Sequence, residues 1–445
     1  MIFYDQDGIP IVATSGNIDG TYKEWYRLDN AAVIFSLITS EDLPAVFRLA
    51  ITLEKTIQYD LMQQALEEII ERFPYFRVQL RKGWFWYHLA HNSKTPKILA
   101  EVNEPCRYIP VYDTRELPFR VRIYGKRIAV EFHHGITDGT GAKSFLFALV
   151  THYLELSGIK FTNIGNIKHL GQIISIEEYE DAFKRYYEAK IPHLPRYSQA
   201  FQLPFQTDPR GKFHVTRAKV AIDAVKPITK QFGVTITELL TAVYIDSLQH
   251  VYLGLSEVLR EKLARPIRVS VAINLRNFFP SKTMRNFSLH VVAGIDPRLG
   301  TYEFDEVVSI VHHSLQVDIN EKDILRQIKR NVRGEMHPLM RMTPVILKNI
   351  FGRYIYSIFG ERQFSGSVSN LGYISPPGDL KEHITDFEFV PARNQIRTVN
   401  CSISGFADDL TINFGNTSNN HAVERLFFRR LAQLGITARI DTNYD

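Results

Sequence analysis

The sequence predicts an α+β protein that is organised as two lobes. Its 445 residues are more than one ordinary hydrophobic core accommodates, so two structural halves are the first expectation. Patterns of period two and of period 3.6 both occur in each half, which is typical of sheets covered by helices. An irregular, proline-containing stretch separates them. We therefore predict an N-terminal lobe at 1–178, a crossover linker at 179–212 and a C-terminal lobe at 213–445.

The N-terminal half begins with two apolar segments of different character. The stretch RLDNAAVIFSLIT at 27–39 is almost continuously apolar, which predicts a buried strand. From Leu61 to Phe73, apolar residues recur at i, i+4, i+5, i+8, i+9 and i+12, which predicts an amphipathic helix. Pro74 then marks the end of this helix.

Two hairpins and a helix complete the predicted N-terminal half. Apolar residues alternate over 76–90 and again over 119–134, with a glycine-containing turn in the middle of each segment. After Gly139 the period changes to 3.6, which predicts a helix that ends near Gly158. A pair of histidines therefore lies between a strand and a helix.

The C-terminal half shows the same mixture of patterns. Thr235 and Glu238 have the spacing of a capping box and predict the start of a long helix that runs to about residue 252. Strands are predicted at 213–222, 267–275, 364–370, 384–390, 397–404 and 409–415, and further helices at 304–318, 337–357 and 421–435.

Composition and charge exclude several classes of protein. Hydrophobic residues at 45% and charged residues at 23% are typical of a folded chain rather than a disordered or fibrous one. The net charge of +5 is spread along the chain, so we expect no nucleic-acid partner. A local group of basic residues, Arg276, Lys282 and Arg285, could meet a phosphate-bearing ligand.

The cysteine content and the apolar runs bear on the compartment. Cys106 and Cys401 are too few for a disulfide framework, which favours a reducing compartment. The first residues lack the basic and apolar regions of a signal peptide, and no apolar run reaches the roughly 18 residues that span a bilayer. We therefore expect a cytoplasmic protein with no membrane span.

The stretch EFHHGITDG at 131–139 is the main candidate for a functional site. His134 and Asp138 are four residues apart, as two metal ligands on one helical face would be. The flanking glycines and the preceding strand argue against a helix there, so we predict no metal site. A serine hydrolase is not favoured either, because FSGSVS at 364–369 departs from the Gly-x-Ser-x-Gly nucleophile elbow.

Two further interpretations of the histidine pair remain open from the residues alone. The histidines can be ordinary packed or surface side chains beside an Asp-Gly turn. Alternatively, a strand-to-helix corner can hold an imidazole rigidly at the rim of a cleft. A neutral imidazole, with a pKa of about 6.5, accepts a proton from an alcohol or amine that attacks a thioester. This reaction requires no metal, no permanently bound cofactor and no enzyme nucleophile.

HHGITDG resembles the His-His-x-x-x-Asp-Gly motif of the CoA-dependent acyltransferase superfamily. The fixed positions correspond to His133, His134, Asp138 and Gly139. The superfamily includes chloramphenicol acetyltransferase, nonribosomal peptide condensation domains, wax ester synthases and alcohol O-acetyltransferases. The motif also falls near the end of the first half of the chain, as it does in the family.

Two more segments support the resemblance. SVAINLRNFFPSKTMRNFS at 270–288 is similar to a segment of alcohol acetyltransferase-like members, and SVSNLGYISPP at 367–377 is similar to the strand near the acyl site of wax synthases. The resemblance covers nearly the whole chain. It implies two chloramphenicol acetyltransferase-like lobes, a pseudodimer of mixed sheets covered by helices, with a channel between the lobes.

The resemblance assigns a role to each motif residue. His134 would be the general base, which takes the proton of the acceptor and later gives it to the departing thiolate. His133 would pack behind it and orient it. Asp138 would form a structural ion pair, for which Arg276 is the candidate partner. Gly139 would let the chain turn without a Cβ clash.

Other assignments from the resemblance concern the acyl site. Ser369 and Asn370 are candidate hydrogen-bond donors to the oxyanion, and ordinary strand-end polar residues are the alternative. Gly135 would keep space open for the substrate. Plant members carry Asp-Phe-Gly-Trp-Gly near the C-terminus, whereas this chain has Asn-Phe-Gly-Asn at 413–416, which separates it from the plant branch.

The predicted function is a stand-alone transfer of an acetyl or other short acyl group from acyl-CoA to an alcohol, by direct attack and without a covalent intermediate. Acyl-CoA would be a co-substrate rather than a permanent cofactor. A second hypothesis is a condensation-type enzyme that uses an acyl carrier protein and forms an amide or ester, and a third is an inactive relative that only binds a ligand or partner. We expect a monomer, because two lobes complete one site.

Overall fold

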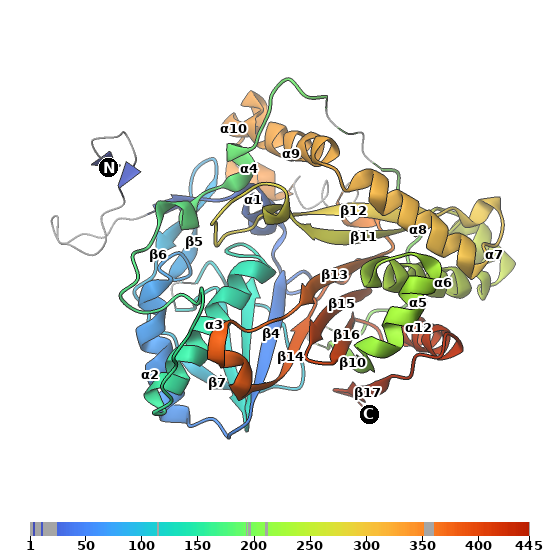
Figure 1. Ribbon diagram of the computed structural model, residues 1–445. Coiled ribbons are helices and arrows are strands. Elements are labelled where there is room, and N and C mark those ends of the chain that lie inside the picture. The colour runs from blue at the N-terminus through green and yellow to red at the C-terminus, as the bar shows by residue number, and fades with distance from the viewer. Residues whose placement is uncertain are drawn as a thin grey trace.

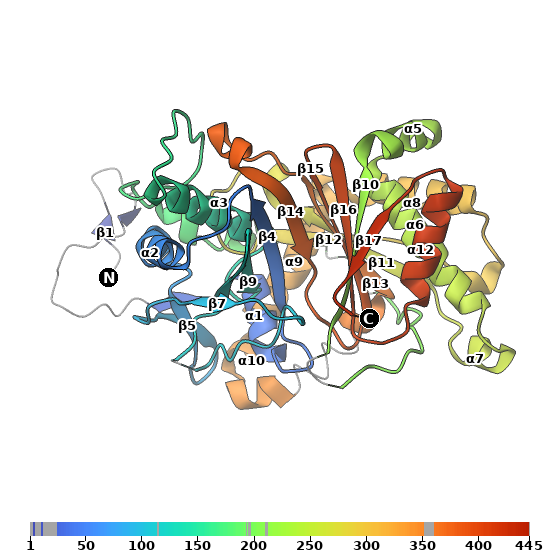
Figure 2. The same ribbon diagram turned by 90° about the horizontal axis from the view of Figure 1, so that it is seen from below.

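The computed structural model describes residues 3–4, 10–11, 25–113, 115–192, 194, 197–209, 212–350 and 360–444. Two mixed sheets form its centre, and helices cover their outer faces (Figure 1). Figure 2 shows the layers in order: helices, the N-terminal sheet, the larger C-terminal sheet and further helices. The chain is therefore α+β, as the sequence predicts.

The N-terminal sheet has five strands in the order β14-β4-β9-β8-β7. Helices α2 and α3 pack on it, and the apolar stripes of both helices face the core that they share with the sheet. The strands are β4 (Val46–Leu53), β7 (Ile98–Ala100), β8 (Phe119–Tyr124), β9 (Arg127–His133) and β14 (Ile384–Val390), and the helices are α2 (Tyr59–Ile69) and α3 (Gly139–Leu156).

A smaller three-stranded sheet, β3-β6-β5, flanks this lobe. It consists of β3 (Trp25–Arg27), β5 (Val78–Lys82) and β6 (Tyr87–His91), and helix α1 (Asn30–Ile38) follows β3. The short strands β1 (Phe3–Tyr4) and β2 (Pro10–Ile11) pair with each other. The two hairpins predicted at 76–90 and 119–134 are confirmed as β5-β6 and β8-β9.

The C-terminal sheet has seven strands in the order β12-β11-β13-β15-β16-β10-β17. Helices α6, α8 and α12 bury one of its faces in a second apolar core (Figure 2). The strands are β10 (His214–Ala221), β11 (Ile267–Asn274), β12 (Ser288–Ile295), β13 (Gly366–Tyr373), β15 (Val399–Phe406), β16 (Asp409–Asn416) and β17 (Arg439–Thr442). The helices of this half are α5 (Ile222–Phe232), α6 (Ile236–Leu253), α7 (Glu257–Lys262), α8 (Phe304–Asp318), α9 (Glu321–Met336), α10 (Pro338–Met342) and α12 (Ala422–Gln433).

Strand β14 comes from the second half of the sequence but completes the N-terminal sheet. It pairs antiparallel with β4, from Ile384 opposite Leu53 to Val390 opposite Arg48. On its other side, the backbone carbonyl of Phe389 accepts hydrogen bonds from Ser402 and Asn413 of the larger sheet, at 2.5 and 2.8 Å. The β14 edge of the N-terminal sheet is therefore bonded to side chains of the C-terminal sheet.

The buried strand predicted at 27–39 is wrong, because most of this segment is helix α1. The buried carboxylate of Asp29 caps the helix and accepts a hydrogen bond from the Ala32 amide at 2.8 Å. The pattern of a short apolar run does not by itself distinguish a buried strand from a buried helix. Here the N-cap Asp29 favours the helix. Strand β4 of the N-terminal sheet was not predicted, and neither were α5, α9, β12 and several short elements.

The helix predicted at 337–357 is interrupted. Helix α10 ends at Met342, and a second helical stretch occupies 345–350, while the rest of the prediction up to residue 357 lies outside the described residues. Thr343 has an extended backbone because the ring of Pro344 disfavours the helical conformation in the residue before it. In the predicted linker, helix α4 (Ala182–Arg185) is followed by turns and extended chain as far as described.

Candidate active site

The histidine pair lies where β9 leaves the N-terminal sheet. His133 is the last residue of β9 and pairs with Val46 of β4, and the amide of His134 still donates to the Ala45 carbonyl at 2.8 Å. Four residues later Asp138 begins helix α3 as its N-cap. The predicted strand-loop-helix unit is therefore present, and both ends of its short loop are held by regular structure.

His133 is a buried structural residue with a defined tautomer. Its Nδ1 accepts a hydrogen bond from the Gly135 amide at 2.9 Å, so the proton of the neutral ring is assigned to Nε2. Nε2 lies 2.8 Å from Thr39 Oγ1 and donates to it. Burial lowers the pKa of His133 to about 3, so the ring stays neutral. A Cβ atom at Gly135 would lie 2.6 Å from Nδ1, so the ring itself occupies the space that the glycine leaves.

His134 is held between two aromatic rings and is only partly buried. Its ring stacks on Phe35 of α1 at 5.0 Å between centroids and 15° between planes, and Phe47 of β4 lies at 4.4 Å on a tilted plane. Its backbone carbonyl accepts from Asn286 Nδ2 at 2.8 Å. The loop and the aromatic rings therefore fix the position of the imidazole.

Electrostatics keep the His134 imidazole uncharged. Burial lowers its pKa to about 4 and outweighs the opposite effect of the nearby Asp138 carboxylate. Its Nδ1 is buried and makes no well-aligned hydrogen bond within the described part of the chain. The neutral imidazole is the form that can accept a proton from a ligand.

Asp138 joins the two halves of the molecule. Its Oδ1 accepts from the amides of Thr140 and Gly141, at 3.0 and 3.2 Å, and so caps α3. Its Oδ2 accepts from Arg276 Nη1 at 2.8 Å and from the Phe287 amide at 2.9 Å. With both oxygens bonded to the protein and the side chain buried, Asp138 has a structural role in this geometry.

Arg276 is the partner that the resemblance suggests, and its guanidinium is fully engaged. Besides Asp138 it donates to the carbonyls of Thr283 and Arg285, at 2.9 and 2.7 Å through Nη2. Lys282 is paired with Glu177 at 2.7 Å, and Arg285 Nη2 donates to the Arg27 carbonyl at 2.7 Å. The three basic residues that could have met a phosphate are therefore occupied by protein partners.

The start of α3 is packed too closely for side chains at two glycines. A Cβ atom at Gly139 would lie 2.7 Å from Leu371 Cδ2, and one at Gly141 would lie 2.4 Å from the Met284 carbonyl oxygen. Gly139 therefore permits the close approach of β13 to α3, a reason that differs from the turn predicted from the sequence. Gly141 was not singled out.

Ser369 and Asn370 point to opposite faces of β13. Asn370 Nδ2 donates to Thr237 Oγ1 of α6 at 2.8 Å, on the helix-covered face, and its Oδ1 accepts from the Gly372 amide at 2.7 Å. Ser369 is half-buried and belongs to the other face, toward the N-terminal lobe. The structure therefore does not bring Asn370 to the side of the sheet that faces the histidines.

Small side chains cover this inner face of β11 and β13. The two strands are parallel, with Val271 opposite Val368, and both valines point into the core beneath α6. Alternation places their neighbours on the inner face. We call Ser270, Ala272, Ser367 and Ser369 the small-residue floor. Ala272 is exposed although it lies on an interior strand, so the floor is not fully covered.

The floor begins beside the first turn of α3, which follows the histidine loop. At this end Asn274 Nδ2 donates to Thr140 Oγ1 at 3.4 Å, and Leu371 lies against Gly139. At the other end Arg397 Nη1 donates to Ser270 Oγ at 3.1 Å. Four residues of strand separate the two ends, which is about 13 Å.

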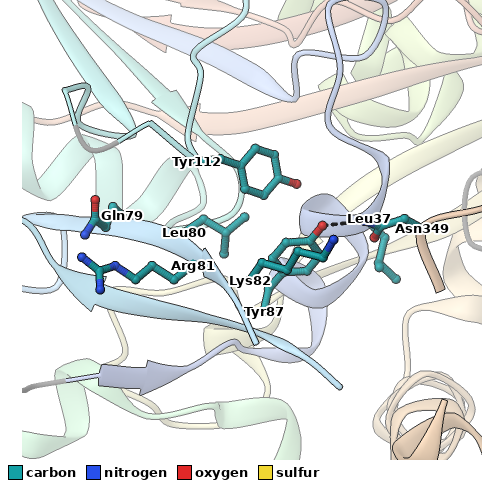
Figure 3. A pocket seen from close by; sticks show the side chains of 8 residues that line it. All are labelled: Leu37, Gln79, Leu80, Arg81, Lys82, Tyr87, Tyr112 and Asn349. Atoms are coloured by element: carbon teal, nitrogen blue, oxygen red, sulfur yellow. Dashed lines mark hydrogen bonds between the residues drawn. The ribbon is translucent and has the colours of Figure 1, made fainter. Parts of the chain in front are cut away.

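A cavity of about 520 Å³ lies on the other side of α1. Figure 3 shows Tyr112 on one side of it and Leu80, Lys82 and Tyr87 on the other. Leu37 lines the cavity, whereas Phe35, about 200° away around the same helix, stacks on His134. None of the candidate site residues predicted from the sequence lines this cavity.

Sequence reasoning missed the residues that hold His134 from outside the motif. Phe35 and Phe47 are far from it in the sequence, and only the fold shows that they contact the ring. Asn286 lies in the segment quoted for the resemblance, without a role there. The Asn-Phe-Gly-Asn segment at 413–416 lies in strand β16 and pairs with β15 and β10.

No group of three or more His, Cys, Asp or Glu side chains is arranged to hold a metal ion in the part of the chain that the structure describes. Within the same residues, no helix has the length and apolar character required to cross a bilayer.

Comparison with known proteins establishes the fold. No family model matches the chain, and no curated protein matches it by sequence. TRI101 of Fusarium sporotrichioides, complexed with coenzyme A and T-2, is 12% identical, with a TM-score of 0.59 over 94% of this chain and 99% of that chain. TRI3 trichothecene 15-O-acetyltransferase of the same species is 11% identical, with a TM-score of 0.58 over 95% and 96%.

The same fold also occurs in peptide synthetases. The epimerization domain from the third module of tyrocidine synthetase B is 11% identical, with a TM-score of 0.58 over 93% of this chain and 97% of that chain. The chain therefore has the two-lobed fold shared by CoA-dependent acyltransferases and condensation-type domains, and the fold predicted from the sequence is confirmed.

Proposed function

We propose that the protein is an acyltransferase that moves an acetyl or other short acyl group from a CoA thioester to an alcohol. The observation that carries this proposal is His134, a neutral imidazole fixed between Phe35 and Phe47 beside the small-residue floor. The fold supports it, because TRI101 is complexed with coenzyme A and a starter condensation domain of rhizomide synthetase with C8-CoA.

The chemistry requires one base and no nucleophile on the protein. His134 accepts the proton of the acceptor hydroxyl while the hydroxyl oxygen attacks the thioester carbonyl carbon. The carbon–sulfur bond of the tetrahedral intermediate then breaks, and the imidazolium returns its proton to the departing thiolate. Because burial lowers the pKa of His134 to about 4, the ring is in its basic form at neutral pH.

The developing oxyanion needs a hydrogen-bond donor, for which we propose the hydroxyl of Ser369. This side chain lies on the small-residue floor, and the next residue on the same face, Leu371, lies against Gly139 at the start of α3. A donor aimed at the oxyanion typically contributes about 10²–10³-fold in rate. His133 and Asp138 act by holding the loop, not by touching substrate.

The test is an assay of free thiol release. The protein is incubated with acetyl-CoA and a panel of alcohols and amines, and thiol is detected with a thiol reagent. We expect release that depends on an alcohol, and a loss of about 10²–10⁴-fold in His134→Ala. His169→Ala, which changes an exposed loop histidine, is the matched control and should retain wild-type rates.

Three other outcomes would redirect the proposal. Unchanged thiol release in His134→Ala would show that the base assignment is wrong. Release only from an acyl carrier protein thioester would favour a condensation-type enzyme. Ligand binding without release from any donor would indicate an inactive relative.

A further inference from the structure

Exposed apolar side chains gather around helix α10, outside the candidate active site. Trp84 is 88% exposed, Met342 75% and Leu339 73%, values that are unusual for large apolar residues. We define the α10 face as the exposed side chains of Trp84, Phe85, Leu339, Met342, Ile346 and Ile350.

Backbone contacts bring the two segments of the α10 face together. The amide of Val345 donates to the Trp84 carbonyl at 2.9 Å, and Lys348 Nζ donates to the Phe85 carbonyl at 2.6 Å. The β5-β6 turn therefore lies against the segment that follows α10. In Figure 2, α10 projects from the same side of the molecule as β5.

The charge around the α10 face is positive. The sequence from Met336 to Ile350 contains no Asp or Glu, while His337 and Arg341 are exposed there. Lys82, at the end of β5, is also exposed. The preceding acid, Glu335, is neutralised by Lys184 at 2.6 Å. Anionic groups would therefore meet no acidic side chain from this segment.

We propose that the α10 face docks reversibly on an anionic lipid bilayer. Exposed apolar side chains that gather in this way mark an interaction site, because leaving them in water forfeits the free energy of burial. The α10 face combines a tryptophan and several aliphatic side chains with a basic rim, by which we mean the exposed residues Lys82, His337 and Arg341. This combination suits the headgroup region of a bilayer, where apolar groups enter the acyl boundary and cations meet lipid phosphates. A neutral protein partner would leave the basic rim without a counterpart. This inference is independent of the proposed catalytic function.

The cavity beside the β5-β6 hairpin adjoins the α10 face. Lys82 and Tyr87 line it from the hairpin, and Asn349 lines it from the segment after α10, where its Nδ2 donates to Tyr87 Oη at 2.6 Å (Figure 3). Docking of the α10 face would therefore place this cavity next to the lipid surface.

The test is sedimentation of the full chain with vesicles. Vesicles of phosphatidylcholine with phosphatidylglycerol should carry down the protein, pure phosphatidylcholine vesicles should bind several-fold less, and added salt should release it. The variant Trp84→Ser/Met342→Ser/Ile346→Ser, checked for an unchanged circular dichroism spectrum, should lower the partition coefficient by about tenfold or more. Arg341→Glu should weaken binding to the anionic vesicles only.

The matched control is Ile173→Ser/Leu299→Ser, which removes two side chains that are 84% and 81% exposed on other loops. It should bind vesicles as the wild type does. The proposal is overturned if neither vesicle binds the protein, or if the control loses binding as much as the α10-face variant. It is also overturned if the wild type is a dimer in solution that the α10-face substitutions dissociate, since the patch would then be an interface between copies.

Discussion

At the scale of single residues, Asp138 is bonded to the protein through both of its carboxylate oxygens. Its two oxygens accept four hydrogen bonds, two from the first turn of α3 and two from the C-terminal half. It thereby fixes the helix that follows the His134 loop and ties that loop to the segment around Arg276. These four hydrogen bonds hold the His134 loop between helix α3 and the C-terminal half, and the position of His134 depends on them.

This arrangement predicts that Asp138 substitutions affect stability more than chemistry. Asp138→Ala removes the N-cap of α3, which typically costs about 0.5–2 kcal/mol, and leaves the half-buried Arg276 guanidinium without its carboxylate partner. Asp138→Asn keeps an acceptor for the helix amides and should cost less. Urea unfolding measures the free energy of unfolding, and the activity of the folded fraction is measured in parallel. Normal stability with a purely kinetic defect would contradict the structural role.

At the scale of elements, strand β13 separates two neighbouring polar residues into different environments. Ser369 belongs to the inner face with the small-residue floor, and Asn370 bonds to α6 on the outer face. We predict that Ser369→Ala lowers kcat about 10²-fold with little change in KM. Asn370→Ala should instead lower the free energy of unfolding by about 1 kcal/mol and keep the kcat of the folded enzyme.

Steady-state kinetics with acetyl-CoA and an accepted alcohol distinguish these two variants. The reverse result, a kinetic loss confined to Asn370→Ala, would show that the oxyanion donor lies elsewhere and that the inner face is not the reactive side.

Elements with strong local signals were predictable from the sequence, and those decided by tertiary contacts were not. The capping box of Thr235 and Glu238 and the change of period after Gly139 are local, and both helices begin where they indicate. The segment at 27–39 lacks such a signal apart from Asp29, so its apolar run was assigned to a strand. No local pattern shows that β14 joins the N-terminal sheet.

The same division applies to the candidate site. The motif identified His134 and Asp138, and the segment at 270–288 identified Arg276 as the ion-pair partner of Asp138. These residues were found because they belong to recognisable sequence motifs. The aromatic rings on either side of His134 come from α1 and β4. In the sequence, an apolar residue in such an element cannot be distinguished from an ordinary core residue. Their role depends on how the elements pack.

At the scale of the whole molecule, three histidines of the described residues, one buried and two half-buried, are held in neutral form. Burial lowers the pKa values of His133 and His290 to about 3 and that of His134 to about 4. Around His290 the charges of Arg330 and Arg397 act in the same direction, and around His134 the carboxylate of Asp138 opposes it. In the unfolded chain each histidine has a pKa of about 6.5. Between the two values the unfolded state binds more protons, so the free energy of unfolding falls as pH falls below about 6.5.

This difference predicts cooperative acid destabilisation. At pH 5 each neutral histidine costs about 2 kcal/mol relative to neutral pH, about 6 kcal/mol for the three. Burial raises the pKa of Asp29 to about 6, and protonation of that carboxyl in the folded state offsets about 1 kcal/mol. The remainder is comparable to the whole stability of many domains. Circular dichroism melts at pH 7 and pH 5 should therefore show a drop in Tm of about 5 °C.

Two variants test whether the neutral histidines cause the loss of folding stability at low pH. His290→Gln removes one titrating group and should reduce the pH dependence of Tm by about a third, whereas His169→Gln, at an exposed position, should leave it unchanged. A flat dependence of Tm between pH 7 and 5 in the wild type would mean that these histidines take up protons in the folded state. In that case His134 would become charged as the pH falls below about 6.5, and activity should fall over the same range, so the stability measurement constrains the catalytic proposal as well.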